Sequence, residues 1–476
     1  MILTITFALP IFVYCWFLLK SESLKFTEMH LNVANAILVF VYFWSIYTWL
    51  KVTKNYLSLY FFFLVYCFFS NAGQTLLQFF PNPGYSHINI YTAYSKSYIL
   101  RMVVFQIICV LAMHIGALIS CAIYNKKNTG EIIITNNVSF PTIINDLLFT
   151  IASIISIIDS IQQFQLRMQY SYGDYYYYTR ESSSPYLLAF FYISMISYYF
   201  CNYNDKTRKT LIYAVAFIQS FIMLLVGRRS TIIPILASLA FLSFLTRPRY
   251  LSRKKVVLYI LASFVFLAVS GSIAELRSHD LNSILSGNVK GIVQKGLFYR
   301  IGDVIQEMGS SARTILLTMH RNDIGIPHQS TIFYDFIQSF IPQDVLDAVG
   351  IYEPTIAVPS AWITYHTNSS SGLGYSIIAE AYLNYGYSGF IFTGIYGFIV
   401  SYLELYCIKK SKEGKILVPT LIIYVLANQI FYARAHFGLA TSRIRISFIL
   451  MIVYYFYKKI KKSDAYSNIS INEGLK

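Results

Sequence analysis

Long apolar segments recur along almost the whole chain, and this pattern limits the possible folds more than any other feature of the sequence. Many of these segments approach the ~20 residues that an α-helix needs to cross the hydrocarbon core of a bilayer. Only 13% of the 476 residues are charged, which is about half the usual share in a soluble chain. This composition excludes a soluble multidomain enzyme, a disordered chain and a disulfide-stapled secreted domain. The sequence therefore predicts an all-α polytopic membrane protein.

The apolar segments predict about twelve transmembrane helices. They lie near residues 2–19, 33–50, 57–79, 99–124, 142–162, 186–201, 210–226, 230–245, 256–274, 389–408, 416–431 and 446–457. The first segment has neither a charged start nor a small-residue cleavage site, so we expect it to be retained as a helix. The chain then divides into transmembrane helices 1–9 (residues 1–274), a large polar loop (275–388), transmembrane helices 10–12 (389–457) and a basic tail (458–476).

Basic residues cluster at every second predicted loop and after the last predicted helix. The clusters lie at residues 51–54, 126–127, 206–209, 247–255, 409–415 and 458–462. Lysine and arginine accumulate in the cytoplasmic loops of membrane proteins, so we expect both termini to be cytoplasmic and loop 275–388 to be extracytoplasmic. The same rule accounts for the net charge of +16. The expected partner is therefore membrane lipid and not nucleic acid.

Loop 275–388 contains helical patterns of its own. Apolar residues recur at helical spacing from Leu297 to Met308, which predicts an amphipathic helix. A second, weaker amphipathic helix is predicted over residues 333–349. Residues 372–385 predict a short helix that Gly386 and Gly389 separate from the tenth span. A half-helix at membrane depth must line protein or a water-filled cavity, so we expect this segment to line an extracytoplasmic site.

Arginine and lysine separate across the predicted membrane. With this topology, 12 of the 16 arginines lie outside, whereas 17 of the 22 lysines lie inside. The positive-inside rule treats the two residues alike and does not explain the difference. A guanidinium group differs from an ammonium group because its planar fork holds phosphate oxygens by two parallel hydrogen bonds. The partition therefore favours a phosphate-bearing ligand at the outer face.

Six outer arginines are candidates for this ligand, and each has a simpler explanation beside the functional one. The candidates are Arg228, Arg229, Arg300, Arg434, Arg443 and Arg445. The pair at 228–229 could reach lipid phosphates from a tight turn, and the group at 434–445 could anchor helices at the interface. Arg300 could instead form a surface ion pair with Asp303 or Glu307 on its own helix.

Glu380 is a candidate for proton transfer or for pairing with an arginine, His366 is a candidate for proton transfer, and His436 stands out by its position without an assigned role. Glu380 lies in the predicted half-helix, where an unpaired carboxylate would be costly. His366 lies shortly before that half-helix, and His436 lies among the last outer arginines. No histidine has HxxxH or HxE spacing, and the six cysteines fall inside apolar segments. We therefore expect neither a metal nor another cofactor.

The chain resembles the Wzy-type O-antigen and oligosaccharide repeat-unit polymerases. The resemblance rests on Val-Gly-Arg-Arg-Ser at 226–230, on the glycine-bounded segment 372–386, and on the order of many spans, one large late loop and a few closing spans. It implies a GT-C-like enzyme of the bacterial inner membrane. It also implies transfer of a growing glycan from polyprenyl diphosphate to the next lipid-linked repeat unit, with a chain-length regulator and a flippase as pathway partners.

This resemblance gives the candidate residues roles. The outer arginines would bind the substrate diphosphate and stabilise its developing charge without a metal, and Glu380 or His366 would deprotonate the acceptor hydroxyl. Two alternatives stay open. An O-antigen ligase would join the glycan to a lipid A core, and a lipid-linked oligosaccharide flippase would transport it. A flippase is disfavoured because the predicted spans carry few charges at mid-membrane and the large loop is unneeded for transport.

Overall fold

The computed structural model describes residues 2–20, 28–81, 83–85, 87–127, 142–170, 185–246, 296–323, 326–356, 358–367, 373–439, 441–453 and 455. Over these residues the regular secondary structure is helical. The helices before the large loop are α1 (Ile2–Lys20), α2 (Glu28–Thr53), α3 (Leu59–Leu77), α4 (Ile90–Ala93), α5 (Lys96–Lys127), α6 (Thr142–Gln169), α8 (Pro185–Cys201), α9 (Lys206–Val226) and α10 (Arg229–Thr246). Those of the loop and the closing part are α13 (Leu297–Met308), α14 (Ser311–Asp323), α15 (Thr331–Gln338), α16 (Gln343–Ala348), α17 (Pro359–His366), α18 (Ile377–Tyr385), η1 (Gly386–Ser388), α19 (Gly389–Lys412), α20 (Leu417–Gln429) and η2 (Ile430–Arg434).

The long helices confirm a multi-pass membrane protein. Seven helical segments among the described residues are long and apolar enough to cross a bilayer, and α1, α8 and α10 contribute shorter apolar stretches. Ten predicted spans coincide with α1, α2, α3, α5, α6, α8, α9, α10, α19 and α20. The twelfth overlaps helical residues 441–453, whereas the ninth, at 256–274, lies outside the described residues. Basic segments 247–255 and 458–462 lie outside them as well.

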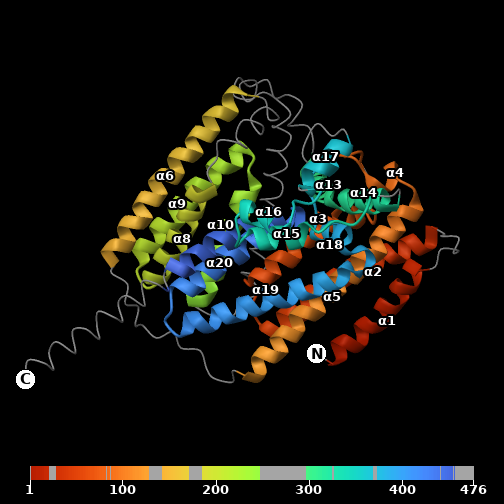
Figure 1. Ribbon diagram of the computed structural model, residues 1–476, viewed down its shortest axis with the longest axis horizontal. Helices are drawn as coiled ribbons and strands as arrows, with labels where there is room; N and C mark the ends of the chain where they lie inside the picture. Colours follow the sequence, from red (N-terminus) through yellow and green to blue (C-terminus); the bar gives the residue numbers. More distant parts are fainter. Residues whose placement is uncertain are drawn as a thin grey trace, which may run out of the picture.

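The spanning helices form two neighbouring groups (Figure 1). Helices α1, α2, α3, α5 and α19 pack together in one group, and α6, α8, α9, α10 and α20 form the other. The closest pair is α5 and α19, where a Cβ atom at Gly116 would lie 2.0 Å from the carbonyl oxygen of Gly394. Glycine at this crossing lets the two backbones approach closely, as is common between helices in membranes.

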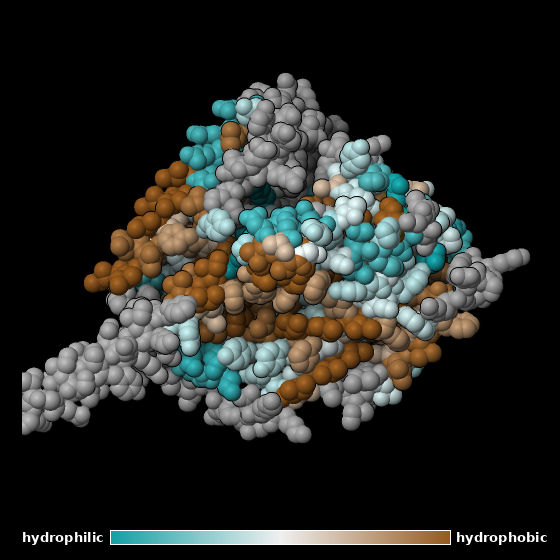
Figure 2. All heavy atoms as spheres, viewed as in Figure 1, coloured by the Kyte–Doolittle hydropathy of each residue, from teal (hydrophilic) through white to brown (hydrophobic). Residues whose placement is uncertain are grey.

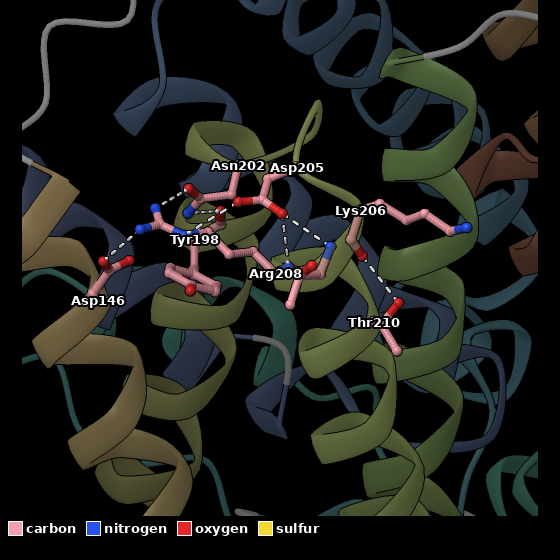
Figure 3. A network of polar contacts seen from close by, with 8 residues as sticks. Asp146, Tyr198, Asn202, Asp205, Lys206, Arg208 and Thr210 are labelled. Atoms are coloured by element: carbon pink, nitrogen blue, oxygen red, sulfur yellow. Dashed lines mark hydrogen bonds and ion pairs between the residues drawn. The ribbon is translucent and has the colours of Figure 1, made fainter.

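An arginine joins the ends of three helices in the second group. The Arg208 guanidinium on α9 lies 3.0 Å from Asp146 on α6 and donates to Asn202, just after α8, at 2.5 Å. Its Nε atom lies 3.5 Å from Asp205, which also caps the start of α9. Figure 3 shows these side chains converging on one guanidinium. Arg208 is thus a structural crosslink between α6, α8 and α9.

Helices α13 to α17 lie together over one end of the bundle (Figure 1). Hydrophilic side chains gather over this region, whereas hydrophobic ones gather along the long helices (Figure 2). The predicted amphipathic helix is present as α13, with Ile301, Val304 and Ile305 buried. The single helix predicted over residues 333–349 is wrong. The chain instead forms α15 and α16, interrupted before Pro342, which has no amide hydrogen for a continuing helix.

The predicted half-helix is present as α18, although it begins at Ile377 and not at residue 372. Ser376 caps its start by accepting a hydrogen bond from the Ile378 amide at 3.2 Å. It ends at Gly386, whose φ of +57° favours glycine, and η1 then leads into α19. Residues 377–384 are all buried. The half-helix is therefore enclosed by other parts of the protein, directly beneath the helices of the large loop.

Candidate active site

Glu380 lies at the centre of this enclosed region, and its side chain is fully buried. Its carboxylate accepts hydrogen bonds from the Thr331 hydroxyl at 3.1 Å, the Tyr432 hydroxyl at 3.3 Å and the Phe437 amide at 2.7 Å. Asn384, one turn further along α18, donates to Thr331 at 2.8 Å and supports the same junction. Glu380 therefore ties α18 both to α15 and to the segment that follows α20.

Arg434 lies in that segment, between the two residues that Glu380 holds. The Arg434 carbonyl accepts a hydrogen bond from the Tyr375 amide at 3.2 Å, just before α18. The neighbouring Ala433 carbonyl accepts one from Asn71 on α3 at 3.2 Å. The backbone that carries Arg434 is thus fixed on both sides. The side chain itself is half-buried, and within the described residues its guanidinium donates no hydrogen bond.

Asp335 and His436 lie beside this junction. Asp335 on α15 is 8% exposed, and its Oδ2 atom has no hydrogen-bond partner in the described part of the chain. A Cβ atom at Gly438 would lie 3.0 Å from Asp335 Oδ2 and 3.1 Å from His436 Cδ2, so glycine leaves room for the two side chains to face the same point. His436 Nδ1 lies 3.1 Å from the Ser360 hydroxyl on α17.

The surroundings of Asp335 change its acidity. Burial is the main cause, and the nearby negative charge of Glu353 adds to it. Together they raise the pKa of Asp335 to about 7, although the Gly438 amide opposes the shift. A carboxyl group with this pKa exchanges protons near neutral pH, as acid–base residues of enzymes commonly do.

The remaining candidate arginines are distributed over several parts of the structure. Arg445 donates to the Gln338 carbonyl at 2.7 Å and so binds the C-terminal end of α15. Arg443 lies close to Tyr424 and Tyr192. Arg300 is on α13, and Arg228 lies between α9 and α10, within electrostatic range of Asp159. Arg229 begins α10, but its side chain lies outside what the structure describes.

The structure separates the two predicted proton-transfer residues. His366 is exposed at the end of α17, where its Nδ1 atom lies 3.0 Å from the Trp362 carbonyl. Its own carbonyl accepts a hydrogen bond from Arg321 at 3.3 Å. Among the described residues, nothing connects the His366 side chain with Glu380. His436, which the sequence singled out without assigning it a role, is the histidine on the segment that Glu380 holds.

Sequence reasoning missed Asp335, Ser360 and Thr331. Asp335 carried one usable signal, because an acidic residue stands there between Ile332, Phe333, Phe336 and Ile337, and a charge inside an apolar stretch needs a reason. Ser360 and Thr331 gave no signal of a functional role in the sequence, because the residues that they contact are distant along the chain. No group of three His, Cys, Asp or Glu side chains in the described ranges is arranged to hold a metal ion.

Comparison with known proteins supports one family. No curated protein and no solved structure matches the chain. A family model does match, over residues 1–463, which is nearly the whole chain and includes both helix groups, the large loop and the Glu380–Arg434 junction. The chain therefore belongs to the O-antigen polysaccharide polymerase Wzy family.

Proposed function

We propose that this membrane polymerase uses the segment 432–438 to bind the diphosphate of a polyprenyl-linked glycan at the extracytoplasmic face. The growing glycan leaves its carrier there and is joined to the non-reducing end of the next lipid-linked repeat unit. The observation that carries the proposal is the clamp on Arg434. A buried carboxylate holds the residues on both sides of an arginine whose guanidinium donates no hydrogen bond to the described residues.

The chemistry of the leaving group explains why such an arginine is useful. When the glycosidic bond to the diphosphate breaks, negative charge grows on the phosphate oxygen. A guanidinium fixed in advance stabilises that charge by two parallel hydrogen bonds, at no cost of rearrangement during the reaction. Arg443 and Arg445 come from the same closing part of the chain and are further candidates to bind the diphosphate. Guanidinium groups can thus supply the charge that a divalent metal would otherwise provide.

Glu380 has a positioning role in this proposal. Its two carboxylate oxygens already accept hydrogen bonds from a hydroxyl on α15, a hydroxyl on η2 and a backbone amide. Accepting a substrate proton would disrupt the clamp that places Arg434. We therefore assign the carboxylate to holding the arginine segment, in place of the base role first considered for it.

The same proposal includes the finer features that the sequence predicts. These are twelve spans in a GT-C-like arrangement, metal-independent transfer of a hexosyl-type glycan, and an inner-membrane location with both termini cytoplasmic. A chain-length regulator and a flippase of the same pathway would act with the polymerase. The basic clusters support the orientation. Cysteines introduced at the exposed positions Ser330 and Lys415 test it, because an impermeant thiol reagent should label the first and not the second in whole cells.

The central test is polymer formation by purified protein supplied with lipid-linked repeat units. Arg434→Ala should reduce the rate by roughly 100-fold, the usual effect of removing one donor to a developing oxyanion. Arg434→Lys should restore little, because an ammonium group lacks the bidentate fork. Arg321→Lys is the control, since Arg321 lies on α14 of the large loop and contacts only the His366 carbonyl among the bonds described.

The products also separate the alternatives. Several repeat units on one carrier identify a polymerase, transfer to a lipid A core identifies a ligase, and movement without bond formation identifies a flippase. Full activity of Arg434→Lys would contradict the proposed role of the guanidinium.

A further inference from the structure

Three polar side chains meet at segment 432–438: His436 belongs to the segment, and Ser360 and Asp335 lie against it. Ser360 comes from α17, His436 from the turn after η2, and Asp335 from α15. These positions are far apart in the sequence, and the clamp made by Glu380 is what brings them together. The arrangement brings a hydroxyl within hydrogen-bond distance of an imidazole and a buried carboxylate close to the same segment, two residues from the arginine proposed to bind the diphosphate.

Distances show how the side chains of Ser360, His436 and Asp335 lie relative to one another. Ser360 Oγ lies 3.1 Å from His436 Nδ1. On the other edge of the ring, the Cδ2 atom of His436 and the Oδ2 atom of Asp335 each lie about 3 Å from the point where a Gly438 Cβ would stand. The Asp335 oxygen is buried and has no hydrogen-bond partner among the described residues. The Gly438 amide partly compensates the burial of this carboxylate, and its Oδ2 atom keeps the capacity to accept a further hydrogen bond.

Each of the other candidate proton acceptors is exposed, lies on another segment or already serves the clamp. The oxygens of Glu380 accept three hydrogen bonds from the protein. His366 is exposed and faces the carbonyl of Trp362. His328 lies 3.2 Å from the Leu383 carbonyl at the end of α18. His436 is half-buried, and it shares a short, fixed segment with Arg434.

We propose that His436 is the general base of the glycosyl transfer and that Asp335 is the carboxylate that orients it. The inference rests on the proposed function of the Arg434 segment. The acceptor sugar hydroxyl approaches the Nδ1 side of the imidazole, in the place that the Ser360 hydroxyl marks. Its oxygen forms the new bond to the anomeric carbon, and its proton passes to Nδ1.

The remaining bonds and charges balance in the same step. The bond between the anomeric carbon and the diphosphate oxygen breaks, and its electron pair leaves with the polyprenyl diphosphate, next to Arg434. The imidazolium that forms is stabilised by the Asp335 carboxylate, and it later releases its proton to solvent. His436, which accepts the proton of the attacking hydroxyl, and Arg434, which binds the departing diphosphate, lie two residues apart. They can thus serve the two ends of one displacement.

Ionisable groups around Asp335 set the pH at which this pair works. The groups near it are Glu353 after α16, Glu380 on α18, Tyr432 on η2, Tyr334 on its own helix and His436, and Arg445 binds the Gln338 carbonyl at the end of that helix. The carboxyl must be ionised to stabilise an imidazolium. Since its pKa is raised to about 7, the rate should increase with pH through neutrality. Removing the charge of Glu353 should lower the pKa of Asp335. In a plot of the rate against pH, the rise on the acidic side (the acidic limb) should then move to lower pH.

The test is steady-state polymerisation by the full-length purified protein, with lipid-linked repeat units as the substrate. His436→Ala and His436→Gln should each lower kcat by roughly 100-fold, the usual contribution of a general base, and should change KM by less than about 3-fold. Added imidazole should restore at least a tenth of the lost rate to His436→Ala. Glu353→Gln should keep kcat and shift the acidic limb downwards, and Asp335→Asn should lower kcat and move the limb, because only the His436 imidazole then has to lose its proton. His87→Ala, at another histidine of the same end of the bundle, is the control.

Each outcome decides the matter. A His436→Ala protein with kcat within about 3-fold of the wild type would overturn the assignment. So would a loss in both His436 variants that imidazole does not relieve and that raises KM in parallel, because that pattern belongs to a structural residue. An acidic limb that moves in neither Glu353→Gln nor Asp335→Asn would remove Asp335 from the mechanism. If the wild-type protein forms no polymer, the proposed function fails instead, whatever the role of His436.

Discussion

Two arginines, Arg208 and Arg434, show how differently this protein uses the same side chain. The guanidinium of Arg208 contacts Asp146, Asn202 and Asp205, and so it joins three helices. Around Arg434, the protein fixes the backbone by Tyr375 and by the two residues that Glu380 holds, and it gives the guanidinium no hydrogen bond within the described ranges. A guanidinium that is saturated by the protein has a structural role. One that is positioned but left unsatisfied is suited to an anionic ligand.

The comparison also explains why neighbouring arginines differ. Arg445 donates to the Gln338 carbonyl and helps to fix α15, so part of its binding capacity is used inside the protein. Position near the active site is therefore a poor guide to function by itself. The useful distinction is whether the charged atoms, or only the backbone that carries them, are held by other residues.

Breaking the clamp should have the largest effect. Glu380→Ala leaves three buried donors without an acceptor, at a cost of ~1–3 kcal/mol each, and should abolish polymer formation. Glu380→Gln should keep at least about a tenth of the activity, because one amide oxygen can still accept from Phe437 and Tyr432 while Thr331 accepts from the amide nitrogen. Polymer ladders and thermal unfolding of both variants provide the measurement. If Glu380→Gln is stable yet as inactive as Glu380→Ala, the carboxylate transfers protons after all.

Removing the structural arginine should affect stability more than catalysis. Arg208→Ala breaks the junction of α6, α8 and α9 and should lower the free energy of unfolding by about 1 kcal/mol, since the pairs are partly exposed. At a temperature where the variant stays folded, its specific activity should match the wild type. Thermal unfolding in detergent and the rate per folded molecule separate the two quantities. A stable but inactive Arg208→Ala protein would contradict the structural role.

Filling the space at Gly438 should give a smaller and more selective effect. Gly438→Ala places a methyl group about 3 Å from both Asp335 Oδ2 and His436 Cδ2, which forces the two side chains apart. We expect about a tenfold lower kcat with little change in KM, because substrate binding relies on the arginines. Steady-state kinetics give both constants. An unchanged kcat would show that the spacing of Asp335 and His436 is unimportant.

Removing divalent metal should have the smallest effect. The proposed site neutralises the diphosphate with guanidinium groups, so excess EDTA should leave the rate of polymer formation unchanged. The measurement compares purified protein before and after chelation, with Mg²⁺ or Mn²⁺ added back. A rate that falls with EDTA and returns with metal would indicate that a carboxylate such as Glu380 or Asp335 binds a cation together with the phosphates.

The sequence alone determined the fold class, because a bilayer imposes its requirements on each segment separately. A span must be long, apolar and helical whatever its neighbours are, so ten predicted spans could be matched with helices such as α5 and α19 without any knowledge of packing. The half-helix α18 was also readable, since Gly386 marks its end locally.

Only the tertiary structure decided which polar residues meet. Glu380 reaches Thr331 across 49 positions of the chain and Phe437 across 57, and no local pattern records such distances. The tertiary structure also places His436, and not His366, on the segment that Glu380 holds, although both histidines stood out in the sequence by their positions. Periodicity describes how a segment faces its surroundings. Which side chain of another segment a residue contacts depends on how the helices pack. The site therefore became visible only in the folded chain.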